Sequence, residues 1–245
     1  MRTQIITIGL VALVLCLCPI TKGADKTFDS NGQILPGETW DTVYVRNNGT
    51  VVDMSGGQIG SQHSFGGLIT SDSSIFNMSG GQIIGYSSGF NSIFINDSST
   101  FNVSGGTIDM YMDFVVYGSA NANISGGNVT AGRLKTSFSS TVNITGGSIN
   151  LDMLDVFGGG RLTISRGLLT IDDTSIGNNS VIDVYGYDFN YDPSKMILTG
   201  RLLDGNQLNI SGLDSLEYQR FNLIPEPSSL LLIGFGLLMI KPRRK

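Results

Sequence analysis

A ten-residue phrase recurs along the middle of this 245-residue chain, and it constrains the fold more than any other feature. The copy at residues 99–108 reads STFNVSGGTI. Aligned copies place its Ser or Thr, replaced by Tyr in the last copy, at positions 55, 79, 104, 125, 145, 165 and 185, so the spacings are 24, 25, 21, 20, 20 and 20 residues. Internal periods of this length are typical of solenoids, propellers and repeat arrays.

The aligned copies share three apolar positions and one polar position. Apolar residues stand one residue before the Ser or Thr (Met54, Met78, Val103, Ile124, Ile144, Ile164, Val184), three before it (Val52, Phe76, Phe101, Ala122, Val142, Leu162, Ile182) and four after it (Ile59, Ile83, Ile108, Val129, Ile149, Leu169, Phe189). The position two residues before it is polar throughout (Asp53, Asn77, Asn102, Asn123, Asn143, Thr163, Asp183). Apolar–polar alternation predicts a β-strand with one buried face, and the Gly-Gly pair that follows predicts a sharp corner.

The repeat predicts an all-β fold, a single-stranded parallel β-helix of about seven to eight coils over residues 24–223. Further short apolar runs such as TVYV, SIFI and DFVVYG precede the phrases, which makes about three strands in a coil of some twenty residues. Propeller blades need more residues, and helical periodicity is absent from this part of the sequence. Stacked coils about 4.8 Å apart would form a rod roughly 35 Å long. The glycine pairs are therefore interpreted as corners and not as phosphate-binding loops.

The ends of the repeat region differ from its middle. We expect residues 25–40, with Pro36 and the single Trp40, to cap the first coil. Residues 190–223 have lost the repeat and are expected to form the last coils and a linker. The two longest spacings predict insertions within GSQHSFGG (60–67) and GYSSGFN (85–91).

The first 23 residues have the layout of a secretory signal peptide. Arg2 is followed by an apolar run from Ile5 to Cys18, and small residues at Gly23 and Ala24 mark the expected cleavage site. An uncleaved anchor is the alternative, although 14 apolar residues are few for a bilayer. The Sec translocon and signal peptidase are the implied partners. Since Cys16 and Cys18 are the only cysteines, the mature chain would contain no disulfide and no thiolate metal site.

The last 22 residues, 224–245, combine a short motif, an apolar segment and a basic tail. Pro225, Glu226 and Pro227 come first. The apolar segment contains Leu230, Leu231, Leu232, Ile233, Phe235, Leu237, Leu238 and Ile240, and the tail contains Lys241, Arg243, Arg244 and Lys245. As a helix the segment would span about 17–20 Å, short of a ~30 Å hydrocarbon core, so it could serve as a short transmembrane helix or marginal tail anchor.

This arrangement resembles the PEP-CTERM sorting signal of exported bacterial proteins. The resemblance implies an exosortase-type transpeptidase that recognises Pro225, Glu226 and Pro227. It also implies transient residence in the inner membrane through the apolar segment, retention by the basic tail, and then delivery to the cell surface or extracellular matrix of a Gram-negative-type bacterium.

The region between the two signals is acidic. Residues 24–225 contain 9 Lys or Arg and 19 Asp or Glu, a formal balance of −10. This charge argues against a nucleic-acid partner, because nucleic-acid binding depends on a basic surface. It suits an exported domain that resists self-association.

Candidate chemical groups are few in this sequence. Carboxylate pairs at Asp172–Asp173 and Asp152–Asp155, with Arg133 and Lys135, could serve polysaccharide cleavage, but each is expected to be a solvated residue on a turn or outer face. His63 is read as a loop histidine, and Asp53, Asp109 and Asp113 as scattered acids and not a calcium site. We expect no catalytic residue, metal or cofactor. The Asn-x-Ser/Thr triplets at 77, 102, 123 and 143 follow from the repeat and predict a stacked polar column, not glycan sites.

These features predict an exported structural or adhesive scaffold associated with exopolysaccharide, and not an enzyme. The alternative is a carbohydrate-binding or polysaccharide-degrading β-helix. An ice-binding face is a remote third, because the threonine ladder that would indicate it is missing.

Overall fold

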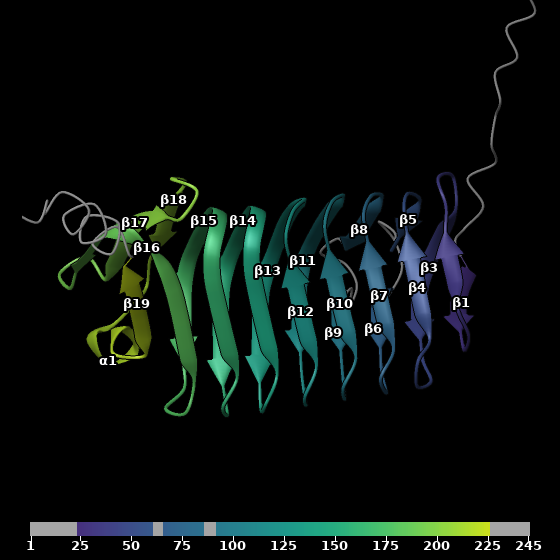
Figure 1. The fold of residues 1–245 in the computed structure, drawn as a ribbon, viewed down its shortest axis with the longest axis horizontal. Helices are drawn as coiled ribbons and strands as arrows, with labels where there is room; N and C mark the ends of the chain where they lie inside the picture. Colours follow the sequence, from purple (N-terminus) through teal and green to yellow (C-terminus); the bar gives the residue numbers. More distant parts are fainter. Residues whose placement is uncertain (1–23, 61–65, 86–91, 226–245) are drawn as a thin grey trace, which may run out of the picture.

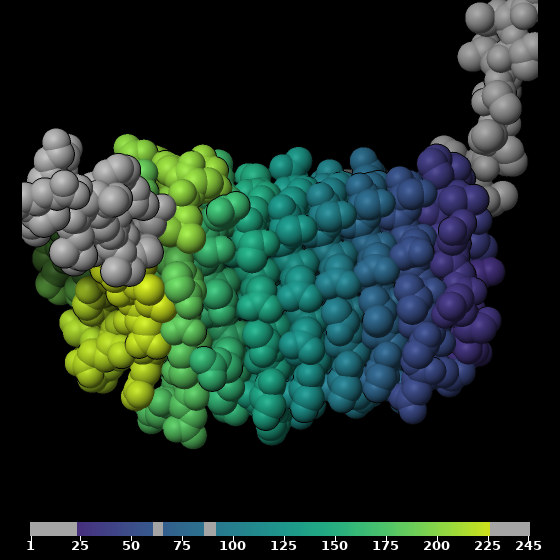
Figure 2. Space-filling view, viewed as in Figure 1, coloured from purple at the N-terminus to yellow at the C-terminus, as the bar shows by residue number. Residues whose placement is uncertain are grey.

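The chain folds into an all-β parallel solenoid of about seven turns, seen in the computed structural model, which describes residues 24–60, 66–85 and 92–225. The coils follow one another in chain order, from β1 at one end to β19 and α1 at the other (Figure 1). In the space-filling view the coils form adjacent ribs across the rod (Figure 2). The expected signal helix (1–23) and membrane helix lie outside the described residues. Within the described part, no helix is long and apolar enough to cross a membrane.

Three faces of stacked strands enclose the core. The first face consists of β2 (Gly32–Ile34), β4 (Val51–Met54), β7 (Ile75–Met78), β10 (Thr100–Val103), β12 (Asn121–Ile124), the first parts of β14 (Thr141–Phe157), β15 (Arg161–Ile176) and β16 (Val181–Asp192), and β19 (Phe221–Pro225). The second face consists of the start of β3 (Thr39–Val45), β5 (Gln58–Ile59), β8 (Gln82–Gly85), the first parts of β11 (Thr107–Val116) and β13 (Asn128–Ser137), the middle of β14 and β15, and β18 (Gln207–Ile210).

The third face completes each coil. It consists of β1 (Ala24–Phe28), the rest of β3, β6 (Gly67–Thr70), β9 (Ser92–Ile95) and the last parts of β11, β13, β14 and β15. Strands β6 and β9 keep their register with β3 and β11, so the extra residues of the two long coils lie between β5 and β6 and between β8 and β9. Those are the two insertion sites that the sequence predicted.

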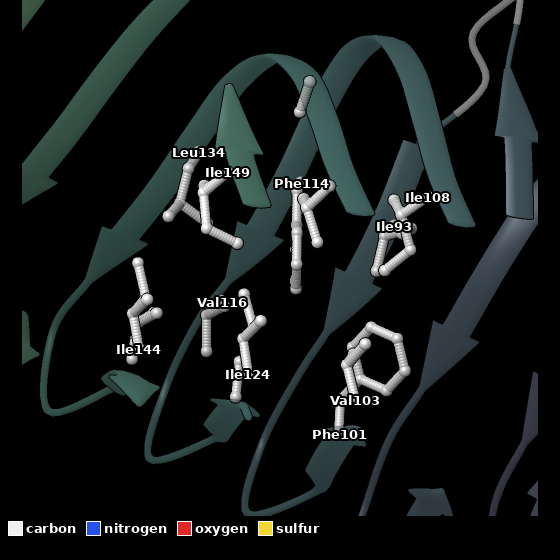
Figure 3. Close-up of a cluster of buried hydrophobic side chains, with 14 of the residues drawn as sticks. Ile93, Phe101, Val103, Ile108, Phe114, Val116, Ile124, Leu134, Ile144 and Ile149 are labelled. Atoms are coloured by element: carbon white, nitrogen blue, oxygen red, sulfur yellow. The ribbon is translucent and has the colours of Figure 1, made fainter. Parts of the chain in front are cut away.

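The repeat columns stack as the alternation predicts. Val103 is in register with Ile124, and Ile124 with Ile144 (Figure 3). The same strands align the column that contains Phe76, Phe101 and Ala122. The ring centroids of Phe76 and Phe101 are 5.7 Å apart, while Ala122 on the other side of Phe101 leaves room for its bulk. Large and small residues therefore compensate along the column, as dense packing requires.

The second glycine of each pair forms the corner between the first and second faces. Gly127 has φ +80° and Gly147 has φ +89°, in the left-handed region that glycine adopts without steric cost. A Cβ at Gly127 would lie 2.9 Å from the carbonyl oxygen of Gly106 in the preceding coil. Conformation and close approach between coils both require glycine, which confirms its interpretation as a corner.

The polar column of the first face is a hydrogen-bonded asparagine ladder. Asn77 Nδ2 donates to Asp53 Oδ1 (2.8 Å), and Asn102 Nδ2 donates to Asn77 Oδ1 (2.8 Å). The ladder continues from Asn123 to Asn102 (2.8 Å) and from Asn143 to Asn123 (2.9 Å). Because each of these amide nitrogens binds the neighbouring coil, the predicted stacked polar column is confirmed.

Buried serines close the turn between the third and first faces. Ser140 Oγ lies 3.0 Å from Val116 O of the preceding coil and 2.7 Å from Ser137 O in its own turn, and it accepts from the Ser137 N–H (2.9 Å). Ser74 and Ser180 make the equivalent contacts to Val45 O and Val156 O. At Val45 O and Val156 O the hydroxyl is a second donor, because these carbonyls also accept from Ser71 N (3.0 Å) and Gly177 N (2.8 Å) of the next coil.

The C-terminal end departs from the expected pattern. The prediction that Phe189 continues the core column of the second face is wrong, because Leu208 of β18 occupies the place in register with Leu169. The chain first leaves the coil as an antiparallel hairpin of β16 with β17 (Ile197–Leu202), and β17 then pairs with β18. The expected last coils are present, and β19 pairs with β16 as far as Pro225.

Side chains from both ends of the domain cover the terminal coils. Helix α1 (Ser215–Tyr218) places Glu217 at the end of the third face, where its carboxylate accepts from Thr174 Oγ1 (2.7 Å) and Ile176 N (2.9 Å). At the other end, Lys26 Nζ lies 5.3 Å from the ring centroid of Phe28 and 5.1 Å from that of Trp40. Residues 25–40 therefore form the first coil itself, partly covered by the Lys26 side chain.

Candidate functional site

The outer surface of the third face brings together four charged residues that are far apart in the sequence. Asp113 is in register with Arg133, and Lys135 is in register with Asp155. Arg133 forms two ion pairs, from Nε to Asp113 Oδ1 (3.5 Å) and from Nη1 to Asp155 Oδ2 (3.4 Å). The structure thus places Arg133, Lys135 and Asp155 in one cluster, with Asp113 as a member that the sequence analysis had considered only for calcium.

Asp155 is the most unusual member of this group. The residue is only 4% exposed although it lies on the outer side of its strand. Burial raises the pKa of its carboxyl, and the positive charges of Arg133 and Lys135 oppose that rise only in part. Its Oδ1 atom has no hydrogen-bond partner among the described residues. A buried, half-satisfied carboxylate costs stability, so its presence calls for an explanation.

Ser137 lies two residues beyond Lys135 on the same outer side. Since Thr136 points into the core, strand alternation directs Ser137 outward, next to Phe157 of the following coil. Ser137 is 5% exposed, and its Oγ has no hydrogen-bond partner in the described part of the chain. A second buried polar atom in this small area therefore lacks a partner.

Two aromatic side chains border these polar groups. Tyr117 follows Val116, which pairs with Thr136, so Tyr117 lies beside Ser137 in the preceding coil. The rings of Tyr117 and Phe138 meet edge to face with centroids 4.7 Å apart. Both rings remain about half exposed, 45% for Tyr117 and 53% for Phe138. We call Asp113, Tyr117, Arg133, Lys135, Ser137, Phe138 and Asp155 together the ionic–aromatic cluster.

Phe138 adopts a left-handed backbone conformation with φ +61°. The equivalent turn residues of five other coils, Asn47, Asp72, Asp97, Gly118 and Gly158, also have positive φ. Asn, Asp and Gly tolerate this conformation, whereas a bulky aromatic residue is strained there by about 1–2 kcal/mol. Phe138 is thus strained at a position where burial compensates the strain only in part, since the residue is 53% exposed.

An apolar column on the same face leads toward the cluster. Tyr44, Ile69, Phe94 and Val115 are in register on successive coils, and the next residues in this column are Lys135 and Asp155. A shallow cavity of about 150 Å³ lies along the column and is lined by Tyr44, Ile69, Phe94, Thr42 and Ser92, among others. The outer third face therefore changes from apolar to ionic along the rod axis.

The remaining candidate residues do not join this cluster. Asp152 and Asp172 are exposed on other parts of β14 and β15, and Asp173 accepts from the neighbouring Thr174 N–H (2.9 Å). Asp53 belongs to the asparagine ladder, and the described residues contain no group of three or more His, Cys, Asp or Glu able to hold a metal. His63 lies outside the described residues.

The processing residues lie at the two edges of the described part. Ala24 begins β1 and Pro225 ends β19, in register with Gly186. Gly23, Glu226, Pro227, the apolar segment and the basic tail lie outside the described residues.

Searches against protein families, curated proteins and solved structures gave no match for this chain. The fold defines the class of protein as a parallel β-solenoid of about seven turns.

Sequence reasoning missed Tyr117, Ser137 and Phe138 as functional candidates. A signal for Phe138 was present, because counting seven residues back from Thr145 reaches a position that is Gly118, Asp97 or Asp72 in the preceding copies. The unpartnered state of Ser137 depends on side-chain geometry and leaves no such trace.

Proposed function

We propose that this chain is an exported structural or adhesive scaffold protein of the cell surface or extracellular matrix, associated with exopolysaccharide. The observation that carries the proposal is the unbroken stack of in-register coils, from β4 through β7, β10 and β12 to β16. Backbone ladders, a continuous core and the asparagine ladder all run parallel to the rod axis. Such an array resists bending and presents a long, regular surface, which are the properties of a scaffold.

Export and sorting are part of the same proposal. The signal-peptide layout of residues 1–23 supports passage through the Sec translocon and cleavage by signal peptidase between Gly23 and Ala24. The PEP-CTERM-like arrangement of residues 224–245 supports recognition by an exosortase-type transpeptidase after transient anchoring in the inner membrane. Strand β19 ends at Pro225, so the motif begins where the solenoid ends.

Replacement of Pro225 and Pro227 by alanine in the full chain tests the sorting step. We expect the variant to stay attached to the membrane uncleaved, while the wild type is released to the surface or medium, as followed by cell fractionation and immunoblotting. Pro193→Ala, a change of the same type in the β16–β17 turn, is the matched control and should be processed normally. Release of the double variant at the wild-type rate would refute the sorting role.

Polysaccharide cleavage on the third face is the second candidate function. The observation that favours it is that Asp113 and Asp155 both form ion pairs with Arg133, since paired carboxylates catalyse most glycoside hydrolysis. We place scaffolding first because Arg133 already engages both carboxylates. Incubation of the protein with neutral and acidic polysaccharides separates the candidates: new reducing ends or unsaturated products that disappear in Asp155→Asn would establish an enzyme.

A further inference from the structure

We propose that the ionic–aromatic cluster binds hexopyranose units of an uncharged polysaccharide. The inference rests on the proposed association with exopolysaccharide and deepens it by naming the site and the class of sugar. Four observations support it: unpartnered polar atoms, local backbone strain, charge balance and the apolar column beside the cluster.

Unpartnered polar atoms concentrate at this site. The described residues contain four buried side-chain polar atoms without a hydrogen-bond partner, and three of them belong to Arg133, Ser137 and Asp155. Arg133 Nε forms the ion pair with Asp113 (3.5 Å), so Ser137 Oγ and Asp155 Oδ1 are the two atoms of the cluster with neither a hydrogen bond nor an ion pair. All three residues lie on the outer side of two successive third-face strands, β13 and β14. Both atoms are covered in the free protein, so a hydroxyl-rich ligand that displaces the covering side chains would supply a donor to Asp155 Oδ1 and could both donate to and accept from Ser137 Oγ. Groups left unsatisfied in the free protein become satisfied in the complex, which favours binding.

The strained backbone at Phe138 points to the same place. Asn, Asp or Gly would relieve the strain at φ +61°, and neighbouring coils use these residues. What only Phe138 adds is an exposed aromatic ring that packs edge-on against Tyr117 (4.7 Å). Aromatic rings offer a flat, electron-rich surface to the C–H face of a pyranose ring. The strain is explained if the ring serves a ligand.

The charges of the cluster favour an uncharged ligand. Arg133 and Lys135 balance Asp113 and Asp155, so the cluster carries no formal net charge, and Arg133 is already paired with both carboxylates. The surrounding domain carries a formal charge of −10 over residues 24–225 and repels polyanions. A uronate or sulfated polymer would therefore be disfavoured, whereas a neutral sugar meets donors and acceptors in one place.

The apolar column extends the site along the rod. Tyr44, Ile69, Phe94 and Val115 continue the outer face away from the cluster, one residue in each coil, at intervals of about 4.8 Å. A linear polysaccharide lying parallel to the axis would contact Tyr44, Ile69 and Phe94, while Val115, between them and the cluster, is buried. We therefore infer a polymer ligand and not a single sugar.

The test is a binding assay with the purified full chain in mild detergent. Cellulose, curdlan and mannan serve as neutral probes, and alginate as the anionic probe, in co-sedimentation or affinity electrophoresis. The variants are Phe138→Asn, Ser137→Ala and Tyr117→Ser, with Tyr111→Ser as the matched control, an exposed aromatic of the same coil that lies before the third-face part of β11. We expect binding to at least one neutral probe and a loss of about fivefold or more in each site variant, with none in the control.

Stability separates a binding role of Phe138 from a structural one. Phe138→Asn should bind less while its resistance to denaturant stays equal or rises, because the strain is released. If the site variants bind a neutral probe as well as the wild type does, the ionic–aromatic cluster is not the binding site. If the wild type binds only alginate, or no probe, the ligand is not an uncharged polysaccharide. Neither result touches the sorting experiment, so failure of this inference and failure of the proposed function remain distinguishable.

Discussion

Replacement of Asn123 by alanine should lower the free energy of unfolding by about 1–3 kcal/mol. Asn123 occupies the middle of the asparagine ladder, where its Nδ2 donates to Asn102 Oδ1 (2.8 Å) and its Oδ1 accepts from Asn143 Nδ2 (2.9 Å). The substitution removes two hydrogen bonds, each with a net contribution of about 0.5–1.5 kcal/mol. It also leaves one acceptor and one donor without a partner, on side chains that are only partly exposed.

Denaturant or thermal unfolding followed by circular dichroism measures this effect. For a domain of this size the loss corresponds to a decrease in Tm of roughly 2–12 °C. Asn128→Ala is the matched control, because the Asn128 side chain in the next strand is exposed and makes no side-chain hydrogen bond within the described part of the chain. It should change stability by less than about 0.5 kcal/mol.

A second substitution separates the ladder from simple packing. Asn123→Asp keeps the shape and the acceptor but loses the donor to Asn102, and it places a charge in the ladder. We expect it to be at least as destabilising as alanine at neutral pH. If both Asn123 variants have the same unfolding midpoint as Asn128→Ala, the ladder contributes nothing to stability and the reasoning is refuted.

Three further substitutions probe other parts of the coil. Gly127→Ala should lower the free energy of unfolding by about 1–3 kcal/mol in a chemical unfolding curve. Alanine at this position would have to adopt φ +80°, and its Cβ would lie 2.9 Å from Gly106 O. Ser140→Ala should cost about 1–3 kcal/mol by the same assay, because it removes the contacts to Val116 O and Ser137 O. The free energy of unfolding of Asp155→Asn, relative to that of the wild type, should increase as pH rises. Burial raises the folded-state pKa of Asp155, so the folded wild type binds the proton more tightly than the unfolded chain does. The wild type therefore loses stability as pH increases from below 3.8 through the raised pKa. Asparagine does not titrate, so the variant does not lose this stability. If the difference in free energy of unfolding between Asp155→Asn and the wild type stays constant from pH 3 to pH 7, the pKa of Asp155 is not raised in the folded state.

The register of the solenoid could be predicted from the sequence because the signal is local and repeated. Each copy places Val103, Ile124 and their equivalents at the same distance from a glycine corner, so one alignment predicts the stack. The last coil could not be predicted in the same way. In β16 the alternating buried positions are Ile182, Val184 and Gly186, and from Gly186 onward the strand pairs with β17, an antiparallel strand whose pairing depends on contacts that alternation does not encode.

Only some members of the ionic–aromatic cluster could be predicted from the sequence. The sequence indicated Arg133, Lys135 and Asp155 as charged residues on outer positions, and the coil length places them side by side once the register is known. Their burial could not be predicted, since outward-facing charges are normally solvated and Asp155 is not. That burial depends on what surrounds the carboxylate, including the ion pair with Arg133 and the adjacent Lys135, which are contacts between coils.

The stacking of equivalent residues is tested most directly by one distance between spin labels. Gln82 and Gln207 are exposed positions of the second face, separated by 125 residues in sequence but, through Thr107, Asn128, Ser148 and Leu168, by only five coil steps. With Cys16 and Cys18 replaced by serine and cysteines introduced at the two glutamines, pulsed dipolar EPR should give a narrow distribution centred at about 24 Å, five intervals of about 4.8 Å. A broad distribution, or one centred beyond about 40 Å, would contradict the in-register solenoid.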